Sequence, residues 1–222
     1  MGLSLVQRLQ NAAATSEPPW IHIVDDDDDV RSAMRRLLAS HGFLVRGHAS
    51  AEEFLEAHDP HAYGCILLDL SMPGLDGLAL QEKLVDANAI LPIIFLTACG
   101  DVSSCASAMR MGAVDYLTKP VDEELLLRTI AFALLRNIDR RSASLRGAIL
   151  EERMASLTRR EREVLLYAMN GRLNKQIAAD LGTSEKTVKV HRARALEKME
   201  VRTVAEAVRM FERIRSAWSP TV

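Results

Sequence analysis

Between residues 20 and 137 the chain alternates short apolar runs with longer amphipathic segments. The apolar runs predict strands at Ile21–Val24, Leu44–His48, Cys65–Leu70, Ile93–Thr97 and Tyr116–Thr118. Apolar residues at helical spacing predict helices at Val30–Ser40, Ala51–His58, Leu78–Asn88, Val102–Met111 and Glu123–Asn137. This strict alternation predicts an α/β domain, in which helices cover both faces of a five-stranded parallel sheet.

Polar residues stand at the carboxyl ends of four of these strands. They are Asp25, Asp26, Asp69, Thr97 and Lys119. Open parallel sheets bind ligands at the carboxyl ends of their strands, so we expect these side chains to converge. Neighbouring carboxylates repel one another unless a cation lies among them, and Mg²⁺ is usually held by one or two carboxylates, water and a phosphate. The pattern predicts that Asp26, Asp69 and a main-chain carbonyl just beyond Asp69 hold Mg²⁺. Lys119 is expected to pair with Asp69 or with a phosphate placed on it.

The run of five aspartates at 25–29 also has a purely structural interpretation. Asp27, Asp28 and Asp29 precede or begin the first predicted helix, where carboxylates cap main-chain N–H groups and favour the helix dipole. We accept this interpretation for these three residues. It is weaker for Asp25 and Asp26, because the same strand-end position carries suitable functional groups in three other segments.

From residue 157 onward the pattern predicts helices alone. Thr158–Glu161 and Thr203–Glu206 have the form of capping boxes, each of which opens a helix. Between them, helices at 174–181 and 185–199 are separated by a short turn that contains Gly182. Two helices joined by so short a turn predict a helix-turn-helix.

The second of these two helices has an apolar face and a mainly basic face. Val188, Ala195, Leu196 and Met199 can face inward. The other face carries Lys186, Lys189, Val190, Ala193, Arg194 and Glu197. Such a helix fits the major groove of double-stranded DNA, with Lys189, Val190 and Arg194 reaching base edges. Phosphate contacts are expected from Asn174, Lys175, Thr187 and His191. A solvated basic helix face is the structural alternative, and the correctly spaced turn and helix before it make that alternative less favoured.

Length and composition fit two packed domains. The chain has 222 residues, of which 48% are hydrophobic. Its apolar runs are too short to cross a bilayer and its N-terminal segment lacks a secretory signal, so we expect a cytoplasmic protein without a membrane partner. Residues 1–137 carry 10 Lys and Arg against 19 Asp and Glu, whereas residues 138–222 carry 18 against 11. The basic half fits a nucleic-acid binder, although ordinary variation in surface charge gives a similar split.

These patterns divide the chain into four main segments. Residues 1–19 are expected to form a loose N-terminal extension, residues 20–137 the α/β domain, residues 138–156 a helical linker and residues 157–215 the helix-turn-helix domain. Ser219–Val222 is expected to be a frayed tail. The apolar positions of the linker fit packing on either domain or on a second chain, and both alternatives stay open.

The cysteines and histidines lack the spacing of a metal site. Cys65, Cys99 and Cys105 are expected to be reduced packing residues. His22, His41, His48, His58 and His61 lie on strands or helix edges, where structural roles are expected.

Four ordered motifs in the first domain resemble the receiver domain of two-component response regulators. They are IVDDD at 23–27, LLDLSMPGLDG at 67–77, FLTACGD at 95–101 and GAVDYLTKP at 112–120. The resemblance implies the flavodoxin-like fold of CheY and a cis bond between Lys119 and Pro120. It also implies that Asp69 accepts a phosphoryl group from a cognate sensor histidine kinase.

The same resemblance implies roles for the other strand-end residues. Mg²⁺ would be held, directly or through water, by Asp25, Asp26, Asp69 and the main-chain carbonyl of Ser71. Thr97 and Lys119 would bind the phosphoryl oxygens. Tyr116 would rotate inward as Thr97 moves toward the phosphate, and this would reshape the surface formed by residues 102–111, 115–118 and 122–136. Receiver domains commonly pair through that surface, which implies a homodimer on phosphorylation.

Three motifs in the second domain resemble the LuxR-type DNA-binding domain. They are LTRREREVL at 157–165, NKQIAADLG at 174–182 and SEKTVKVHRARALEKM at 184–199. With the receiver, they resemble the FixJ/NarL branch, and VHRA at 190–193 is closer to FixJ. Some relatives have lysine where Ala193 stands. The resemblance implies binding to paired operator half-sites, supported by the last helix, and RNA polymerase is a further candidate partner.

Three functions compete as interpretations of these motifs: a phosphorylation-controlled transcription factor, an aspartyl-phosphate phosphohydrolase, and a DNA-binding regulator whose receiver works without phosphorylation. A phosphohydrolase usually has a second acid two residues after its nucleophile, where this chain has Ser71, so we expect no enzyme. The first function is favoured. The third remains the alternative, because a complete acidic pocket permits phosphorylation without proving it.

Overall fold

The computed structural model describes residues 6, 7, 9, 11, 18–59, 62–98 and 102–218, with side chains up to residue 212. The chain forms two compact units, Met1–Arg141 and Ser142–Val222. Helix α6 (Glu123–Ser156) contributes to both units, so the last predicted receiver helix and the predicted linker form one helix. The expectations for Cys99, His61 and residues 219–222 lie outside the described residues.

The first unit alternates strands and helices as the sequence predicts. In chain order it contains β1 (Trp20–Val24), α2 (Asp28–Ser40), β2 (Leu44–His48), α3 (Ala51–Ala57), β3 (Gly64–Asp69), α4 (Gly77–Asp86), β4 (Ile93–Thr97), α5 (Val102–Arg110), β5 (Asp115–Thr118) and the first part of α6. Every strand pair is parallel, and the order β2-β1-β3-β4-β5 confirms the predicted five-stranded sheet. Apart from α6, the predicted boundaries differ from the observed ones by at most two residues.

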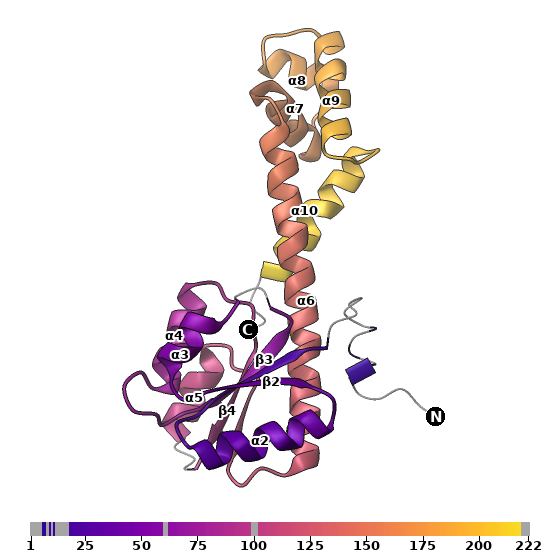
Figure 1. Ribbon diagram of the computed structural model, residues 1–222. Helices are drawn as coiled ribbons and strands as arrows, with labels where there is room; N and C mark the ends of the chain where they lie inside the picture. The colour runs from indigo at the N-terminus through magenta and orange to yellow at the C-terminus, as the bar shows by residue number, and fades with distance from the viewer. Residues whose placement is uncertain are drawn as a thin grey trace. The chain divides into compact units, whose positions relative to one another are not determined.

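The sheet separates two hydrophobic cores because side chains alternate between its faces. Leu67 of β3 packs in the core that includes Leu38 of α2 and Ile130 of α6. Its neighbour Leu68 packs in the other core, with Phe54 of α3 and residues of α4 and α5. Figure 1 shows α3, α4 and α5 on one side of the sheet and α6 on the other, which confirms helices on both faces.

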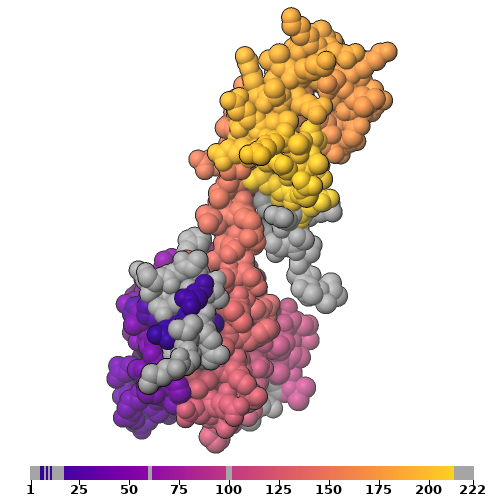
Figure 2. All heavy atoms as spheres, turned by 90° about the vertical axis from the view of Figure 1, so that its right-hand side faces the viewer, coloured from indigo at the N-terminus to yellow at the C-terminus, as the bar shows by residue number. Residues whose placement is uncertain are grey.

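The described N-terminal residues pack on the first unit, so the expectation of a loose extension is wrong for them. Val6 and Leu9 are buried members of the same core as Leu38. The Tyr63 hydroxyl also donates to the main-chain carbonyl of Leu9 at 3.4 Å. Val6 and Leu9 are three residues apart and therefore lie on one side of a helical turn. Figure 2 shows the indigo atoms of these N-terminal residues on the surface of the unit.

The second unit is helical. It contains the end of α6, α7 (Arg159–Met169), α8 (Asn174–Asp180), α9 (Glu185–Lys198) and α10 (Val204–Trp218). One of its cores joins Leu157, Leu165, Ala195, Met199 and Ala207. A second core joins Val164, Ala168, Ile177, Ala178 and Val188, so that α7 packs against both α8 and α9. The predicted parallel-sheet domain is thus followed by an all-α domain.

Both predicted capping boxes begin helices, but they differ in detail. At α7 the Thr158 and Glu161 side chains cap each other's main-chain N–H groups, as predicted. Hydrogen bonds from Lys198 and Thr158 lower the pKa of the buried Glu161 to about 2. At α10 the Thr203 hydroxyl accepts from Glu206 N, whereas the Glu206 carboxylate accepts from Arg202 N, one residue earlier than in a capping box.

The packing of Leu9 leads to a prediction about stability. Leu9→Ala removes a buried side chain and should lower the free energy of unfolding by about 2 kcal/mol. Urea unfolding of the full chain measures this loss. Asn11→Ala, an exposed position in the same segment, is the control and should change stability by about 0.5 kcal/mol at most. A Leu9→Ala curve equal to that of the wild type would show that the segment is loose after all.

Candidate functional site

Parallel pairing brings two carboxylates together at the edge of the sheet. In the register of β1 and β3, Val24 is the partner of Leu68, so Asp25 and Asp69, the next residues, are neighbours. Only 2% of Asp25 and 7% of Asp69 is exposed. Burial of two neighbouring carboxylates requires positive charge close by, because charged groups lose their hydration inside a protein.

Lys119 supplies that charge. Its ammonium lies 2.6 Å from Asp25 Oδ2 and 2.6 Å from Asp69 Oδ1. The main-chain N–H of Lys119 donates to the carbonyl of Thr97 at 2.7 Å. The bond between Lys119 and Pro120 is cis, as the resemblance implied. Burial alone would lower the pKa of Lys119, but the hydrogen bonds that its ammonium donates to Asp25 and Asp69, and the charges of these two carboxylates, raise it above its ordinary value. The ammonium therefore stays protonated at neutral pH.

The main chain around Asp69 holds its carboxylate in place. Ser71 N donates to Asp69 Oδ2 at 2.7 Å. The loop then returns to the sheet, where Gly77 N donates to the carbonyl of Leu70 at 3.0 Å. A Cβ atom on Gly77 would lie 2.4 Å from the carbonyl oxygen of Asp69, so only glycine fits there. The pattern of apolar and polar residues does not predict this requirement.

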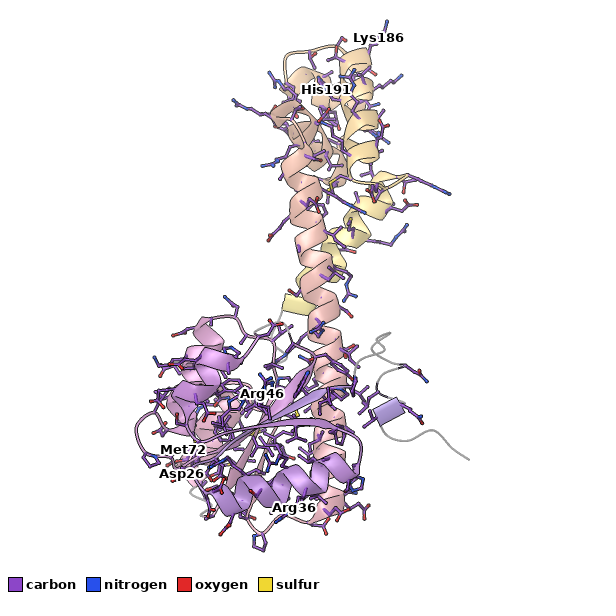
Figure 3. All side chains as sticks on the ribbon, in the orientation of Figure 1. Asp26, Arg36, Arg46, Met72, Lys186 and His191 are labelled. Carbon is purple, nitrogen blue, oxygen red and sulfur yellow. The ribbon has the colours of Figure 1, made fainter. Side chains whose placement is uncertain are left out.

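Asp26 differs from the two buried carboxylates. It is exposed, and its carboxylate has no hydrogen bond or ion pair with the described part of the chain. Exposure and the lack of a partner within the described residues thus distinguish Asp26 from Asp25 and Asp69. Figure 3 shows Asp26 at the same edge of the unit as Met72, which follows β3.

The available donors fit a hard divalent cation. Asp26, Asp69 and the carbonyl of Ser71 all offer oxygen, which Mg²⁺ prefers. Among the described residues, no three His, Cys, Asp or Glu side chains are grouped closely enough to hold a metal ion. A cation here would therefore also draw on main-chain and water oxygens, as Mg²⁺ usually does.

Thr97 and Tyr116 flank this edge of the sheet. Thr97 ends β4 and is buried, and β5 pairs with β4 so that Tyr116 is the partner of Phe95. The two rings are 6.1 Å apart between centroids. Tyr116 is partly buried and packs against the core that contains Phe95. The structure therefore places Thr97 and Tyr116 on adjacent strands, next to Lys119.

Three histidine side chains contact the ring of Phe54. His22 Nδ1 and His48 Nε2 are 3.2 Å apart, and His58 stacks on Phe54. Within the described structure, His48 Nδ1 and His58 Nε2 are buried without a hydrogen-bond partner. Burial lowers the pKa of His22 to about 4, helped by the charges of His48, Arg46 and His58. The main-chain carbonyl of His48 accepts from Asp25 N at 3.2 Å, so β2 also contacts the main chain at the site.

The second unit contains the predicted helix-turn-helix. Gly182, with φ +62°, ends the turn after α8, and the Ser184 hydroxyl caps α9 by accepting from Thr187 N at 3.1 Å. Val188, Ala195 and Met199 are buried and Leu196 is partly buried, which confirms the predicted inner face.

The predicted DNA-contacting residues lie mostly on the outside of α8 and α9. Those exposed are Lys175, Lys186, Lys189, Val190 and Arg194. Those partly buried are Asn174, Thr187 and His191. Figure 3 shows Lys186 projecting near the start of α9. Arg192, which the sequence analysis missed, donates from Nη1 to Asn174 Oδ1 at 3.2 Å and joins the two helices. The only signal for it was its place in the basic helix.

Comparisons with known proteins agree with this architecture. Residues 21–131 match the response regulator receiver domain, and residues 155–211 match the LuxR family of bacterial regulatory proteins. The response regulator protein TodT of Pseudomonas putida is 41% identical over 197 residues, 89% of this chain and 87% of TodT. The transcriptional regulatory protein FixJ of Azorhizobium caulinodans is 40% identical over 190 residues, 86% of this chain and 90% of FixJ. The solved structure of the response regulator StyR has a TM-score of 0.77 at 43% identity, and the match covers 88% of this chain and 98% of StyR.

The fold and the strand-end site thus define a receiver domain, and the helical unit adds a DNA-binding domain. The chain belongs to the two-component response regulators that carry a LuxR-type DNA-binding domain. It is a transcription regulator and not an enzyme. Its receiver domain implies a sensor kinase, and its helix-turn-helix implies DNA binding. No helix in the described part of the chain is long and apolar enough to cross a membrane.

The pKa of His22 leads to a prediction about acid stability. The folded chain keeps His22 neutral down to about pH 4, whereas the unfolded chain takes up the proton near pH 6.5. Stability is therefore greatest above pH 6.5 and should fall between pH 6.5 and pH 4, by at most about 3 kcal/mol for this group. Urea unfolding across this range measures the loss, and His22→Phe should flatten it. Identical profiles for both proteins would assign the loss to other groups.

Proposed function

We propose that Asp69 is the phosphoacceptor. A carboxylate oxygen of Asp69 attacks the phosphorus of a phosphohistidine on the cognate sensor histidine kinase. A new O–P bond forms, the N–P bond breaks, and its electron pair stays on the imidazole nitrogen of the kinase. The observation that carries this proposal is the contact of Lys119 with both buried carboxylates, because it places an ammonium where the phosphoryl oxygens would come to lie.

Mg²⁺ would be held by Asp26, Asp69 and the carbonyl of Ser71, with Asp25 acting directly or through water. When bound, the cation would offset the negative charge of the phosphoryl oxygens. The chain's own residues do the rest. Ser71 N orients the Asp69 carboxylate, and Lys119 and Thr97 receive the phosphoryl group.

The proposed response to phosphorylation is a change of surface followed by pairing of two chains. Thr97 moves toward the phosphoryl group, and Tyr116 turns into the space between β5 and its neighbours. The surface formed by α5, β5 and the first part of α6 then joins two receivers. Exposed apolar side chains on α5 and α6 support this surface: Val102, Met109, Leu125, Phe132 and Leu135.

We further propose a division of labour along the chain. Residues 20–137 form the receiver, residues 138–156 the linker and residues 157–215 the DNA-binding domain. In the DNA-binding domain, Lys189, Val190 and Arg194 contact base edges, and the neighbouring polar residues contact phosphates. A dimer presents two such domains to paired half-sites of double-stranded DNA. A receiver that works without phosphorylation is the alternative, because a complete acidic pocket permits phosphorylation without proving it.

Substitution of Asp69 tests the phosphoacceptor. With Mg²⁺ and acetyl phosphate, the wild type should gain the mass of one phosphoryl group, sediment as a dimer and bind operator DNA more tightly. Asp69→Asn keeps the size of the side chain but removes the nucleophilic carboxylate, so it should do none of these. Asp76→Asn, the exposed cap of α4, is the control and should respond like the wild type. If the wild type is phosphorylated but its DNA affinity does not change, the receiver acts by the alternative route.

Substitution of Lys189 tests base reading by α9. Lys189→Ala should weaken binding to the operator about tenfold and binding to random DNA much less, because a base contact contributes only at the specific site. Fluorescence anisotropy with both DNAs at one salt concentration measures this. Lys83→Ala, an exposed lysine of the first unit, is the charge-matched control. Equal losses on both DNAs would show that Lys189 contacts phosphate only.

A further inference from the structure

Arg31 holds both ends of the loop that follows β1. Its Nη1 donates to the main-chain carbonyl of Asp25 at 2.6 Å, and its Nη2 donates to the carboxylate of Asp28 at 2.9 Å. The aliphatic part of Arg31 passes over Gly47 of β2, where a Cβ atom would lie 3.6 Å from Arg31 Cδ. The planar guanidinium thus joins the end of β1 to the start of α2.

The loop between those two contacts includes Asp26, which no side chain in the described part of the chain restrains. Asp25 is held by Lys119 through Oδ2 and by Asp27 N through Oδ1. Asp26 has no such partner within the described residues, so its direction depends on the main chain. The carbonyl that accepts the hydrogen bond from Arg31 belongs to the peptide bond between Asp25 and Asp26. A donor on that oxygen limits rotation of the peptide plane that carries Asp26.

We propose that Arg31 is a positioning residue of the phosphoacceptor site. By restraining the peptide bond between Asp25 and Asp26, it keeps the Asp26 carboxylate directed at the divalent cation. The inference rests on the proposed function, because that function places Mg²⁺ beside Asp26.

Charge and positioning predict effects of opposite sign. If Arg31 acted only through its charge, its removal would strengthen Mg²⁺ binding, because a fixed positive charge near the site repels a divalent cation. If Arg31 acts by positioning Asp26, its removal weakens Mg²⁺ binding, because an unrestrained Asp26 loses more conformational entropy when the cation binds. The direction of the change therefore separates the two roles.

Calorimetric titration of the unphosphorylated full chain with MgCl₂ tests the inference. Arg31→Lys keeps the charge but loses the planar fork, and Arg31→Gln loses both. Both variants should bind Mg²⁺ about tenfold more weakly than the wild type, as groups that orient metal ligands commonly do when lost. Arg36→Gln is the control, because Arg36 lies exposed on the same helix (Figure 3) and has no hydrogen bond or ion pair with the described part of the chain. Its affinity should stay within about twofold of the wild type, since salt screens exposed charges.

The outcomes separate this inference from the proposed function. If the wild type binds Mg²⁺ and the Arg31 variants bind it equally well or more tightly, the inference is overturned and the proposed function stands. If the wild type does not bind Mg²⁺, both are overturned.

Phosphorylation rates with acetyl phosphate at increasing Mg²⁺ give a second readout. For Arg31→Lys, the Mg²⁺ concentration for half-maximal rate should rise about tenfold, while the saturating rate should stay within about twofold of the wild type. This split is expected because excess Mg²⁺ compensates for weaker binding. A lower saturating rate at an unchanged half-maximal concentration would overturn the inference, since general damage to the site has that effect.

Discussion

The contact of one ammonium with two buried carboxylates is the constraint on which the first unit depends. Lys119 lies 2.6 Å from both Asp25 and Asp69, at the edge of a sheet whose interior is apolar. Loss of the ammonium would leave two buried carboxylates without a positive charge beside them, at a cost of about 3–5 kcal/mol. Lys119 therefore joins the ends of three strands. The same three groups form the proposed phosphoacceptor site, so stability and signalling share one contact.

Main-chain contacts around this cluster set its geometry. The Ser71 N–H orients Asp69, the His48 carbonyl accepts the N–H of Asp25, and Arg31 grips the carbonyl of Asp25. The missing side chain of Gly77 lets α4 begin directly against Asp69. Functional groups keep a useful geometry only when a supporting layer restrains them, and here that layer is largely the main chain. Asp26 is the exception, because its own side chain has no such support within the described structure.

The two domains were predictable for different reasons. In the second unit the signals are local: Thr158 and Glu161 are three residues apart and cap one helix. The predicted inner face of α9 is also confirmed, since Val188 and Ala195 are fully buried. In the first unit the strand-end rule correctly brought Asp25, Asp69 and Lys119 together, although they are far apart in the sequence. The rule does not predict that Asp25 is buried and Asp26 exposed, because burial there depends on how other segments pack over the strand end.

The sequence by itself determined the order of strands and helices, the parallel sheet and the helix-turn-helix. These follow from apolar periodicity and caps, which are properties of neighbouring residues. The family of regulators was indicated by the resemblance of the motifs. Only the tertiary structure decided that Val6 and Leu9 join the core, that Lys119 binds two carboxylates at once and that Arg31 grips the carbonyl of Asp25. Such contacts join segments that are far apart in the sequence, so no local pattern predicts them. They form because buried charges and buried main-chain groups need partners.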